Sequence, residues 1–396
     1  MNDSDLMKNT QLPAIIVVTY NRINSLKRLL NSISKASYGD IVPDLIISID
    51  YSDTHQKSIK TIAEQFEWQG QKQIICHPKN LGLKKHIFYC GDLTETYDSV
   101  IILEDDLFVS QGFFKYTQQA LEACEKQNNI AGIALYNNTF NESASLPFEA
   151  IKDNGDFYLM QVPCSWGQVW TKAEWKAYKK WYKSSFNYEN FSKLPKGISG
   201  WSQDSWKKPC FLYLAETQTY FAYPYISYSM NLNEAGTNVR SKDFKFLNGL
   251  ELTSDVSTLT LNNNAPKYGM AYMLLSKSLN YFNPGLKNYD YLVDLFGSQL
   301  ENYDDDQWLI TALEVSQYEK AYGLELKPIE LNIIYGIRGE ALFLTQKKHI
   351  RTTRLSRFII NYYYPIPEWY FPFFQRSILD RIKGVIFFWL TRIKFK

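Results

Sequence analysis

The sequence predicts an α/β protein in which a largely parallel β-sheet is covered by helices. Short apolar, β-branched runs at residues 14–20, 44–50 and 100–103 show the unalternating pattern of strands buried on both faces. Segments with the apolar spacing of an amphipathic helix lie between them, such as residues 25–33 and 57–68. Strands that alternate with helices of this length are typical of βαβ units in a doubly wound sheet.

The next elements continue this alternation. A short strand is expected at residues 73–77, and helices are expected at 84–92 and 113–127. No GxGxxG or P-loop motif follows the first strand, which argues against the usual dinucleotide and nucleoside-triphosphate sites.

Composition narrows the classes of function. The 396 residues are enough for one extended domain or two. Aromatic residues make up 16% of the chain, and aromatic rings both fill cores and stack on sugars. A formal net charge of +2 argues against nucleic acid as the main partner. The five cysteines are scattered and contain no CxxC pair, so we expect neither a disulfide framework nor a zinc site.

The chain is expected to be cytoplasmic, as a soluble or peripheral membrane protein. Residues 1–11 are polar and lack the basic-then-apolar layout of a signal peptide. No segment approaches the ~20 apolar residues of a membrane-spanning helix.

Three consecutive acids, Glu104, Asp105 and Asp106, follow the apolar run at 100–103. They fall at the C-terminal end of a strand, the edge of an open α/β sheet where ligands bind. Adjacent carboxylates repel each other, and hard oxygen ligands favour Mg²⁺ or Mn²⁺, which are often held by one or two carboxylates and substrate phosphates. The alternative is a strand that ends in a solvated acidic turn.

The motifs at 19–22 (TYNR), 47–50 (ISID) and 102–106 (ILEDD), in this order, resemble the GT-A glycosyltransferases. The resemblance is greatest to the inverting GlcNAc-transferases that initiate complex N-glycans and to bacterial enzymes that build surface polysaccharide. It extends to residues 113–116 and covers about residues 12–240. It implies a GT-A fold, a mixed sheet flanked by helices, that binds a nucleotide-sugar.

The resemblance also implies roles for individual residues. Arg22 would contact the donor nucleotide, and Asp50 and His86 would contact its base, which suggests UDP. Asp105 would approach the ribose or the donor sugar, and Asp106 would be the ligand of Mn²⁺ or Mg²⁺. The alternatives are a surface arginine for Arg22 and a partly buried helix histidine for His86. The full set assigned to the donor is Arg22, Asp50, His86, Glu104, Asp105 and Thr237.

The catalytic base implied by the resemblance is Asp204, the only acid in the tryptophan-flanked segment 200–206. The family has two consecutive aspartates where this chain has Gln203 and Asp204, and Ser205 is inserted before the second tryptophan. The alternative is a surface aspartate between two buried tryptophans.

Three tryptophans are candidates for a sugar or acceptor pocket. Trp166 and Trp170 belong to an expected glycine-containing loop, and Trp201 precedes Asp204. Residues 223–230 resemble the strand before a donor-closing loop. That loop would be residues 233–238, in which Thr237 would offer a hydroxyl to the phosphate.

The C-terminal third has no match in the family. The expected division is a catalytic domain at 12–245, an extension at 246–345 and a basic aromatic tail at 346–396. From residue 347 onward, eleven lysines and arginines stand against two acids, among many aromatic residues. This composition suits an interfacial segment on anionic lipid, and the alternative is a helix docked on the catalytic domain. A second acid run at 304–306 is expected to be a solvated turn.

The predicted function is a metal-dependent inverting glycosyltransferase. It would move a sugar from a nucleotide-diphosphate donor to a glycan or lipid-linked acceptor in surface polysaccharide (capsule or lipopolysaccharide) biosynthesis. A sugar nucleotidyltransferase and a non-catalytic sugar-binding protein remain alternatives. A glycoside hydrolase with Glu104 and Asp204 as its acid pair is a further one, although adjacent Asp105 and Asp106 fit a metal better.

Overall fold

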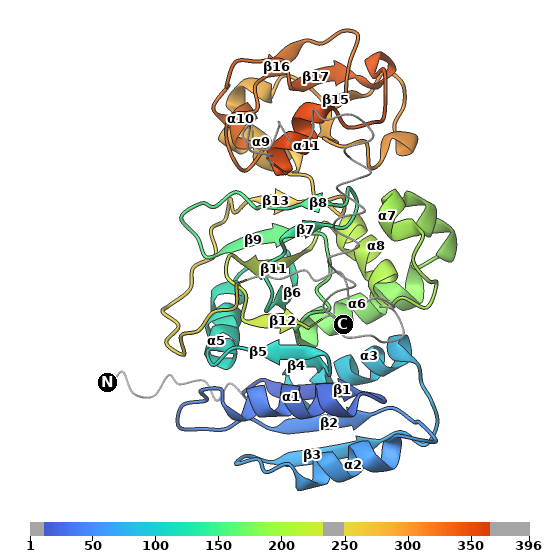
Figure 1. The fold of residues 1–396 in the computed structure, drawn as a ribbon, viewed down its shortest axis with the longest axis vertical. Coiled ribbons are helices and arrows are strands. Elements are labelled where there is room, and N and C mark those ends of the chain that lie inside the picture. The colour runs from blue at the N-terminus through green and yellow to red at the C-terminus, as the bar shows by residue number, and fades with distance from the viewer. Residues whose placement is uncertain (1–11, 233–248, 365–396) are drawn as a thin grey trace, which may run out of the picture.

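The computed structural model describes residues 12–232 and 249–364 (Figure 1). Its centre is a nine-stranded sheet in the order β13-β9-β11-β6-β10-β4-β1-β2-β3. β1, β2, β3 and β4 are mutually parallel, whereas β10 runs antiparallel to both β4 and β6. The strands are β1 Ala14–Thr19, β2 Leu45–Ile49, β3 Lys72–Cys76, β4 Ser99–Glu104, β6 Ile130–Ala134, β9 Phe157–Met160, β10 Gln168–Thr171, β11 Tyr220–Pro224 and β13 Lys267–Tyr268. The predicted class, an α/β protein with a mixed sheet flanked by helices, is confirmed.

Alternate residues of the buried strands enter two different cores, one on each face of the sheet. Ile15 and Val17 of β1 belong to a cluster with α1, α2 and α5, whereas Ile16 and Val18 belong to a cluster with α3, α6 and α8. A strand buried on both faces therefore shows no polar alternation. These helices are α1 Ile23–Ser34, α2 Gln56–Gln65, α3 Leu83–Asp92, α5 Phe113–Cys124, α6 Lys172–Ser184 and α8 Lys207–Thr217.

Short elements surround the sheet. A capping box between Thr171 and Glu174 begins α6, in which the threonine hydroxyl accepts from the Glu174 amide and the Glu174 carboxylate accepts from the Thr171 amide. The remaining elements of this part are α4 Thr94–Tyr97, η1 Tyr188–Lys193, α7 Lys196–Ser199, the pair β5 Leu107–Val109 and β12 Ser229–Asn231, and the hairpin β7 Phe140–Asn141 and β8 Leu146–Pro147.

The expected single strand at 223–230 is wrong. β11 ends at Pro224, the chain bends, and β12 then pairs antiparallel with β5 outside the main sheet. A proline at this point cannot donate a ladder hydrogen bond, which favours the end of a strand. The expected closing loop at 233–238, including Thr237, lies outside the described residues.

The C-terminal part is a second, four-stranded sheet in the order β14-β15-β17-β16, at the end of the molecule opposite α1 and α2 (Figure 1). Its core is continuous with the core on one face of the nine-stranded sheet. Its elements are α9 Ser276–Phe282, η2 Pro284–Leu286, β14 Tyr291–Val293, η3 Leu300–Asn302, β15 Trp308–Thr311, β16 Lys320–Tyr322, α10 Leu331–Ile334, β17 Leu342–Gln346, η4 Lys347–His349 and α11 Arg357–Tyr363. We call residues 276–364 the C-terminal module.

The described start of the expected basic tail, residues 346–364, belongs to this module, and α11 packs against its other elements. Ile359 of α11 is fully buried, and the Tyr362 hydroxyl donates to the Leu326 carbonyl at 2.7 Å. The expected tail is therefore packed against the protein at α11. Residues 365–396 lie outside the described part. Within the described ranges, no helix is long and apolar enough to span a bilayer. The acids at 304–306 form an exposed turn, as predicted.

Candidate functional site

Parallel pairing brings the three predicted motifs to one edge of the sheet. In the register of β1 with its neighbours, Thr19 lies opposite Ile49 and Val18 lies opposite Glu104. The ladder continues past the strands, because the Asp50 amide donates to the Thr19 carbonyl at 2.9 Å and the Asp105 amide donates to the Val18 carbonyl at 3.0 Å. Acids that directly follow β2 and β4 are thereby fixed at the carboxyl edge, where open α/β sheets bind ligands.

A single guanidinium connects two of the three adjacent acids. Arg22, which precedes α1, places Nη2 2.5 Å from Asp105 Oδ1 and Nη1 2.8 Å from Asp106 Oδ2. The Thr19 hydroxyl donates to the other oxygen of Asp105 at 2.7 Å. Asp105 is buried, and desolvation raises its pKa to about 6 even though Arg22 and Thr19 favour the charged form. We call Arg22, Glu104, Asp105 and Asp106 the acidic cluster.

The acidic cluster carries more negative than positive charge. Desolvation and the nearby charge of Asp106 raise the pKa of Glu104, and Arg22 only partly opposes them. A further cation would relieve this repulsion and stabilise the ionised carboxylates. The cluster thus has the electrostatics of a cation site.

Asp106 has the donor atom that such a cation needs. Its Oδ1 is buried and accepts no hydrogen bond from any residue that the structure describes. Within those same ranges, no three His, Cys, Asp or Glu side chains converge on one point. A Mg²⁺ or Mn²⁺ ion that keeps most of its ligands from water or phosphate fits this arrangement, whereas an all-protein cage does not.

Lys207 is a second cation near the acids that the sequence reasoning missed. It begins α8, lies with Nζ 3.6 Å from Glu142 Oε2 and 5.0 Å from the Trp201 ring centroid, and its charge acts to lower the pKa of Glu104. The charge at the N-terminal end of α8 therefore acts on the acidic cluster. The sequence feature that could have identified Lys207 is its position three residues after Asp204.

Asp50 organises the turn before α3. Its Oδ1 accepts from the amides of Tyr51 and Leu81, both at 2.8 Å, and its Oδ2 accepts from the Gly82 amide at 3.1 Å. Gly82 has φ +72°, a left-handed conformation that a glycine adopts without strain. The buried carboxylate thus joins the end of β2 to the start of α3. A contact between Asp50 and the base of the donor nucleotide stays a prediction.

A hollow of about 500 Å³ lies at the ends of β1, β2 and β3. The Tyr51 hydroxyl donates to Asp53 at 2.5 Å, and the Asn80 side-chain amide donates to the Tyr51 backbone carbonyl at 3.0 Å. The sequence reasoning assigned none of these lining residues, although each follows one of the three parallel strands. The lining residues are Tyr20, Tyr51, Ser52, Asp53, Pro78, Lys79 and Asn80, and we call the space that they line the strand-end hollow.

His86 is buried in α3. Its Nε2 lies 2.7 Å from the Ser48 hydroxyl, which also lies 3.1 Å from His77 Nε2. Burial lowers the pKa of His86 to about 4, so its ring is neutral at pH 7. The placement matches the helix-histidine alternative, and the predicted contact with a base remains untested.

The structure places the three tryptophan candidates in different surroundings. Trp170 is not in a loop: it lies in β10, is fully buried and packs against Trp175, so its assignment to a pocket is wrong. The glycine-containing loop ends at Gly167, and antiparallel pairing with β4 covers the residues after it. Trp166 is partly buried against the Tyr136 ring, and Trp201 is partly buried beneath Lys207. These two remain candidates.

Asp204 lies in the turn before α8 and its side chain is exposed. Its amide donates to the Ser202 hydroxyl at 3.1 Å, and Trp206 after it is buried while Trp201 before it is partly buried. The carboxylate is therefore accessible to a substrate, and it lies three residues before Lys207, the first residue of α8. Its role as a base stays a prediction.

Comparisons with known proteins add distant likenesses only. No family model and no curated protein matches the sequence. Among solved structures, residues 1–349 of S. aureus TarS in complex with UDP-GlcNAc share 13% identity over 58% of this chain and 61% of that one, with a TM-score of 0.37. GalNAc-T7 with UDP, GalNAc and Mn²⁺ shares 10% identity over 55% of this chain and 43% of that one, with a TM-score of 0.38.

A third likeness is to the mannosyltransferase PcManGT from Pyrobaculum calidifontis in complex with GDP-Man and Mn²⁺. It shares 9% identity over 48% of this chain and 50% of that one, with a TM-score of 0.32. The chain thus spans between 43% and 61% of the length of these three structures. At such scores the likenesses assign no function.

Removing the guanidinium of Arg22 should destabilise the fold. Arg22→Gln leaves the buried Asp105 and its neighbour without their cation, so we expect a loss of roughly 3 kcal/mol in the free energy of unfolding, the lower end for breaking a buried pair. Denaturant unfolding measures it. Arg338→Gln, at an exposed arginine of the C-terminal module, is the control and should stay within about 0.5 kcal/mol of wild type. Equal stability of the two variants would contradict the bridging role.

Proposed function

We propose that the protein is a metal-dependent inverting glycosyltransferase of the GT-A type that uses a UDP-sugar as donor. One observation carries the proposal: the acidic cluster, with the free buried oxygen of Asp106, shares the carboxyl edge of the sheet with the strand-end hollow. A nucleotide-diphosphate has the matching parts, a planar base and a phosphate chain that carries a cation. The sequence resemblance to GT-A enzymes assigns Arg22, Glu104 and Asp105 of the acidic cluster to the donor and Asp106 to the metal.

The strand-end hollow would receive the nucleoside. Tyr20 and Tyr51 supply aromatic surface there, while Asp53 and Asn80 supply hydrogen-bonding groups that can bind the base or the ribose. Asp50 would hold the shape of this end through its bonds to the turn before α3. Arg22 would favour the ionised form of Asp105 and hold both aspartates in place.

The chemistry would proceed by direct displacement. The diphosphate leaving group gains negative charge as its bond to the sugar breaks, and a Mn²⁺ or Mg²⁺ ion held by Asp106 would stabilise that charge. Asp204 would accept the proton of the acceptor hydroxyl as its oxygen attacks the opposite face of the anomeric carbon. Attack on the opposite face inverts the configuration. Lys207, near Glu104, would add positive charge on this side of the site.

The acceptor and the cellular setting are proposed from sequence. The acceptor would be a glycan or a lipid-linked saccharide in surface polysaccharide biosynthesis, such as capsule or lipopolysaccharide. The enzyme would act in the cytoplasm at the inner face of the membrane, with residues 365–396 as its contact with anionic lipid. That segment keeps six of the eleven basic residues counted after residue 346, together with most of the aromatic ones.

Donor binding should require both the metal and Asp106. UDP with Mn²⁺ should raise the thermal stability of the wild type, and a ligand at a hundredfold excess over its Kd adds about 2.7 kcal/mol. Asp106→Asn should lose the Mn²⁺-dependent part of this gain, because it removes the charged donor atom. Asp305→Asn, in the exposed turn at 304–306, should respond like wild type. Stabilisation by GDP or CDP but not by UDP would refute the choice of base.

Turnover should depend on the basicity of Asp204. Asp204→Asn preserves the shape of the side chain and removes its proton affinity, so kcat should fall by ~10²–10⁴, the usual contribution of a positioned base. Binding of UDP with Mn²⁺ should survive, since Asp106 rather than Asp204 would hold the ion. Product NMR should show inversion at the anomeric carbon. Near-normal kcat in Asp204→Asn, or a retained configuration, would rule out this mechanism.

Membrane contact should be lost when the end of the chain is removed. Deletion of residues 376–396 should release the protein from anionic liposomes and leave transfer to a soluble acceptor intact. Binding of the full chain should also weaken with added salt, because the Debye length falls from about 10 Å at 0.1 M to about 3 Å at 1 M. Sedimentation with vesicles measures both effects. Loss of folding in the truncated chain, seen by circular dichroism, would instead favour a docked segment.

A further inference from the structure

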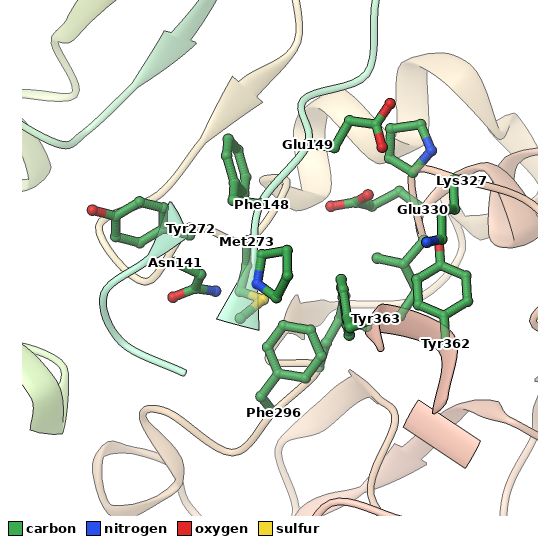
Figure 2. Close-up of a pocket in the computed structure, with 14 residues that line it drawn as sticks. Asn141, Phe148, Glu149, Tyr272, Met273, Phe296, Lys327, Glu330, Tyr362 and Tyr363 are labelled. Atoms are coloured by element: carbon green, nitrogen blue, oxygen red, sulfur yellow. The ribbon is translucent and has the colours of Figure 1, made fainter. Parts of the chain in front are cut away.

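A second pocket lies where the β7–β8 hairpin and its following residues meet the C-terminal module (Figure 2). Its volume is about 80 Å³, roughly the share of liquid volume that two or three water molecules take up. The strand-end hollow and the acidic cluster use other residues, so this pocket is separate from the proposed donor site. Its polar lining includes Asn141, Glu149, Lys327 and Glu330, and its rings include Phe148, Tyr272, Phe296, Tyr362 and Tyr363.

Glu330 is the unusual residue of this pocket. It is only 4% exposed, and its Oε2 is buried without a hydrogen-bond donor anywhere in the described ranges. Figure 2 shows its carboxylate next to that of Glu149, which comes from a different part of the chain. Burial, helped by the charge of Glu149, raises the pKa of Glu330 to about 7. A hydrogen bond from its own backbone amide opposes this rise, but the buried Oε2 still lacks a donor, and a ligand that donates a hydrogen bond and brings positive charge would remove that cost.

The walls of the pocket favour the same kind of ligand. The ring centroids of Phe296 and Tyr363 lie 6.0 Å apart, and those of Tyr362 and Tyr363 lie 4.9 Å apart. The faces of such rings attract cations and pack against alkyl groups. Lys327 already holds its ammonium 5.0 Å from the Tyr362 centroid, and it forms no ion pair with Glu330 in the part of the chain that the structure describes.

We propose that this pocket binds a small primary ammonium group, with Glu330 accepting its N–H and the aromatic rings enclosing its alkyl part. A primary ammonium donates to the unpartnered oxygen, which a quaternary ammonium cannot do. A divalent metal would need more oxygen ligands than two carboxylates amid rings provide. A neutral sugar hydroxyl would donate but leave the carboxylate charge uncompensated. The site does not depend on the transferase proposal, because it uses none of the donor residues.

The test is isothermal titration of the full chain with methylammonium and ethanolamine at pH 8. Each should bind saturably at one site, and ethylene glycol, the neutral analogue of ethanolamine, should bind at least tenfold more weakly. Tetramethylammonium should also bind at least tenfold more weakly. Failure of both amines to bind would overturn the proposal, and so would equal binding of ethylene glycol. Tighter binding of glucose, titrated as a neutral sugar, would also overturn it.

Three variants locate the ligand. Glu330→Gln should weaken ethanolamine binding at least tenfold, whereas Glu149→Gln, at the exposed rim, should weaken it less. Lys327→Gln should leave binding unchanged or strengthen it, since it removes a competing cation. Glu330→Gln should keep a Tm at pH 8 no lower than wild type, because it replaces a buried charge by a neutral group; this separates lost binding from lost folding. Unchanged binding in Glu330→Gln would overturn the assignment.

The pH dependence gives an independent check. Ethanolamine stays protonated between pH 6 and pH 8, whereas Glu330 ionises across this range. Affinity should therefore rise about tenfold from pH 6 to pH 8. The other titratable groups around Glu330 are Glu149, Lys327, Tyr268, Tyr272, Tyr362 and Tyr363, and the tyrosines stay neutral here because burial raises the pKa of each of the four. A flat profile, or one that persists in Glu330→Gln, would contradict the role of this carboxylate.

Discussion

The shared guanidinium of Arg22 is the interaction on which the carboxyl edge of the sheet depends. β4 leaves the core directly into three carboxylates, and two of them contact the same arginine at 2.5 and 2.8 Å. Without it, Asp105 would be buried beside two like charges, which favours protonation over ionisation. Because Arg22 precedes α1, the start of that helix is tied to the end of β4. The edge is thereby fixed in a form that still has excess negative charge to offer a cation.

Much of this edge could be predicted from the sequence because it follows from strand order. β-branched runs buried on both faces identified β1, β2 and β4, and parallel pairing then required the residues after them to meet. The bonds from Asp50 to Thr19 and from Asp105 to Val18 are the direct result. The pairing of Arg22 with Asp105 and Asp106 could not be predicted, because it depends on the side-chain direction at a turn rather than on an apolar pattern.

The predictions that were wrong or incomplete have physical causes of the same kind. The strand-end hollow combines Tyr20, Tyr51 and Asn80 from three separate loops, and no local pattern reports a cavity between loops. Trp170 was assigned to a loop because β10 has only four residues, too short for a periodic pattern, and follows Gly167. The docking of α11 was hidden by composition, since the same aromatic and basic residues suit a lipid surface and a protein surface.

Asp106 Oδ1 and Glu330 Oε2 are both buried carboxylate oxygens without a donor among the described residues, but their surroundings differ and determine what each can bind. Asp106 Oδ1 lies beside an arginine and two other acids at an open edge of the sheet, where a metal ion can retain water or phosphate ligands. Glu330 Oε2 lies among aromatic rings in a pocket of about 80 Å³, which is too small for a metal ion with a full shell of water or phosphate ligands. Desolvation raises the free energy of an ionised carboxylate at both places, yet only the ring-lined one favours an organic cation, because ring faces replace part of its hydration. Under the two proposals, the same kind of unsatisfied atom would therefore select a metal at one site and an amine at the other.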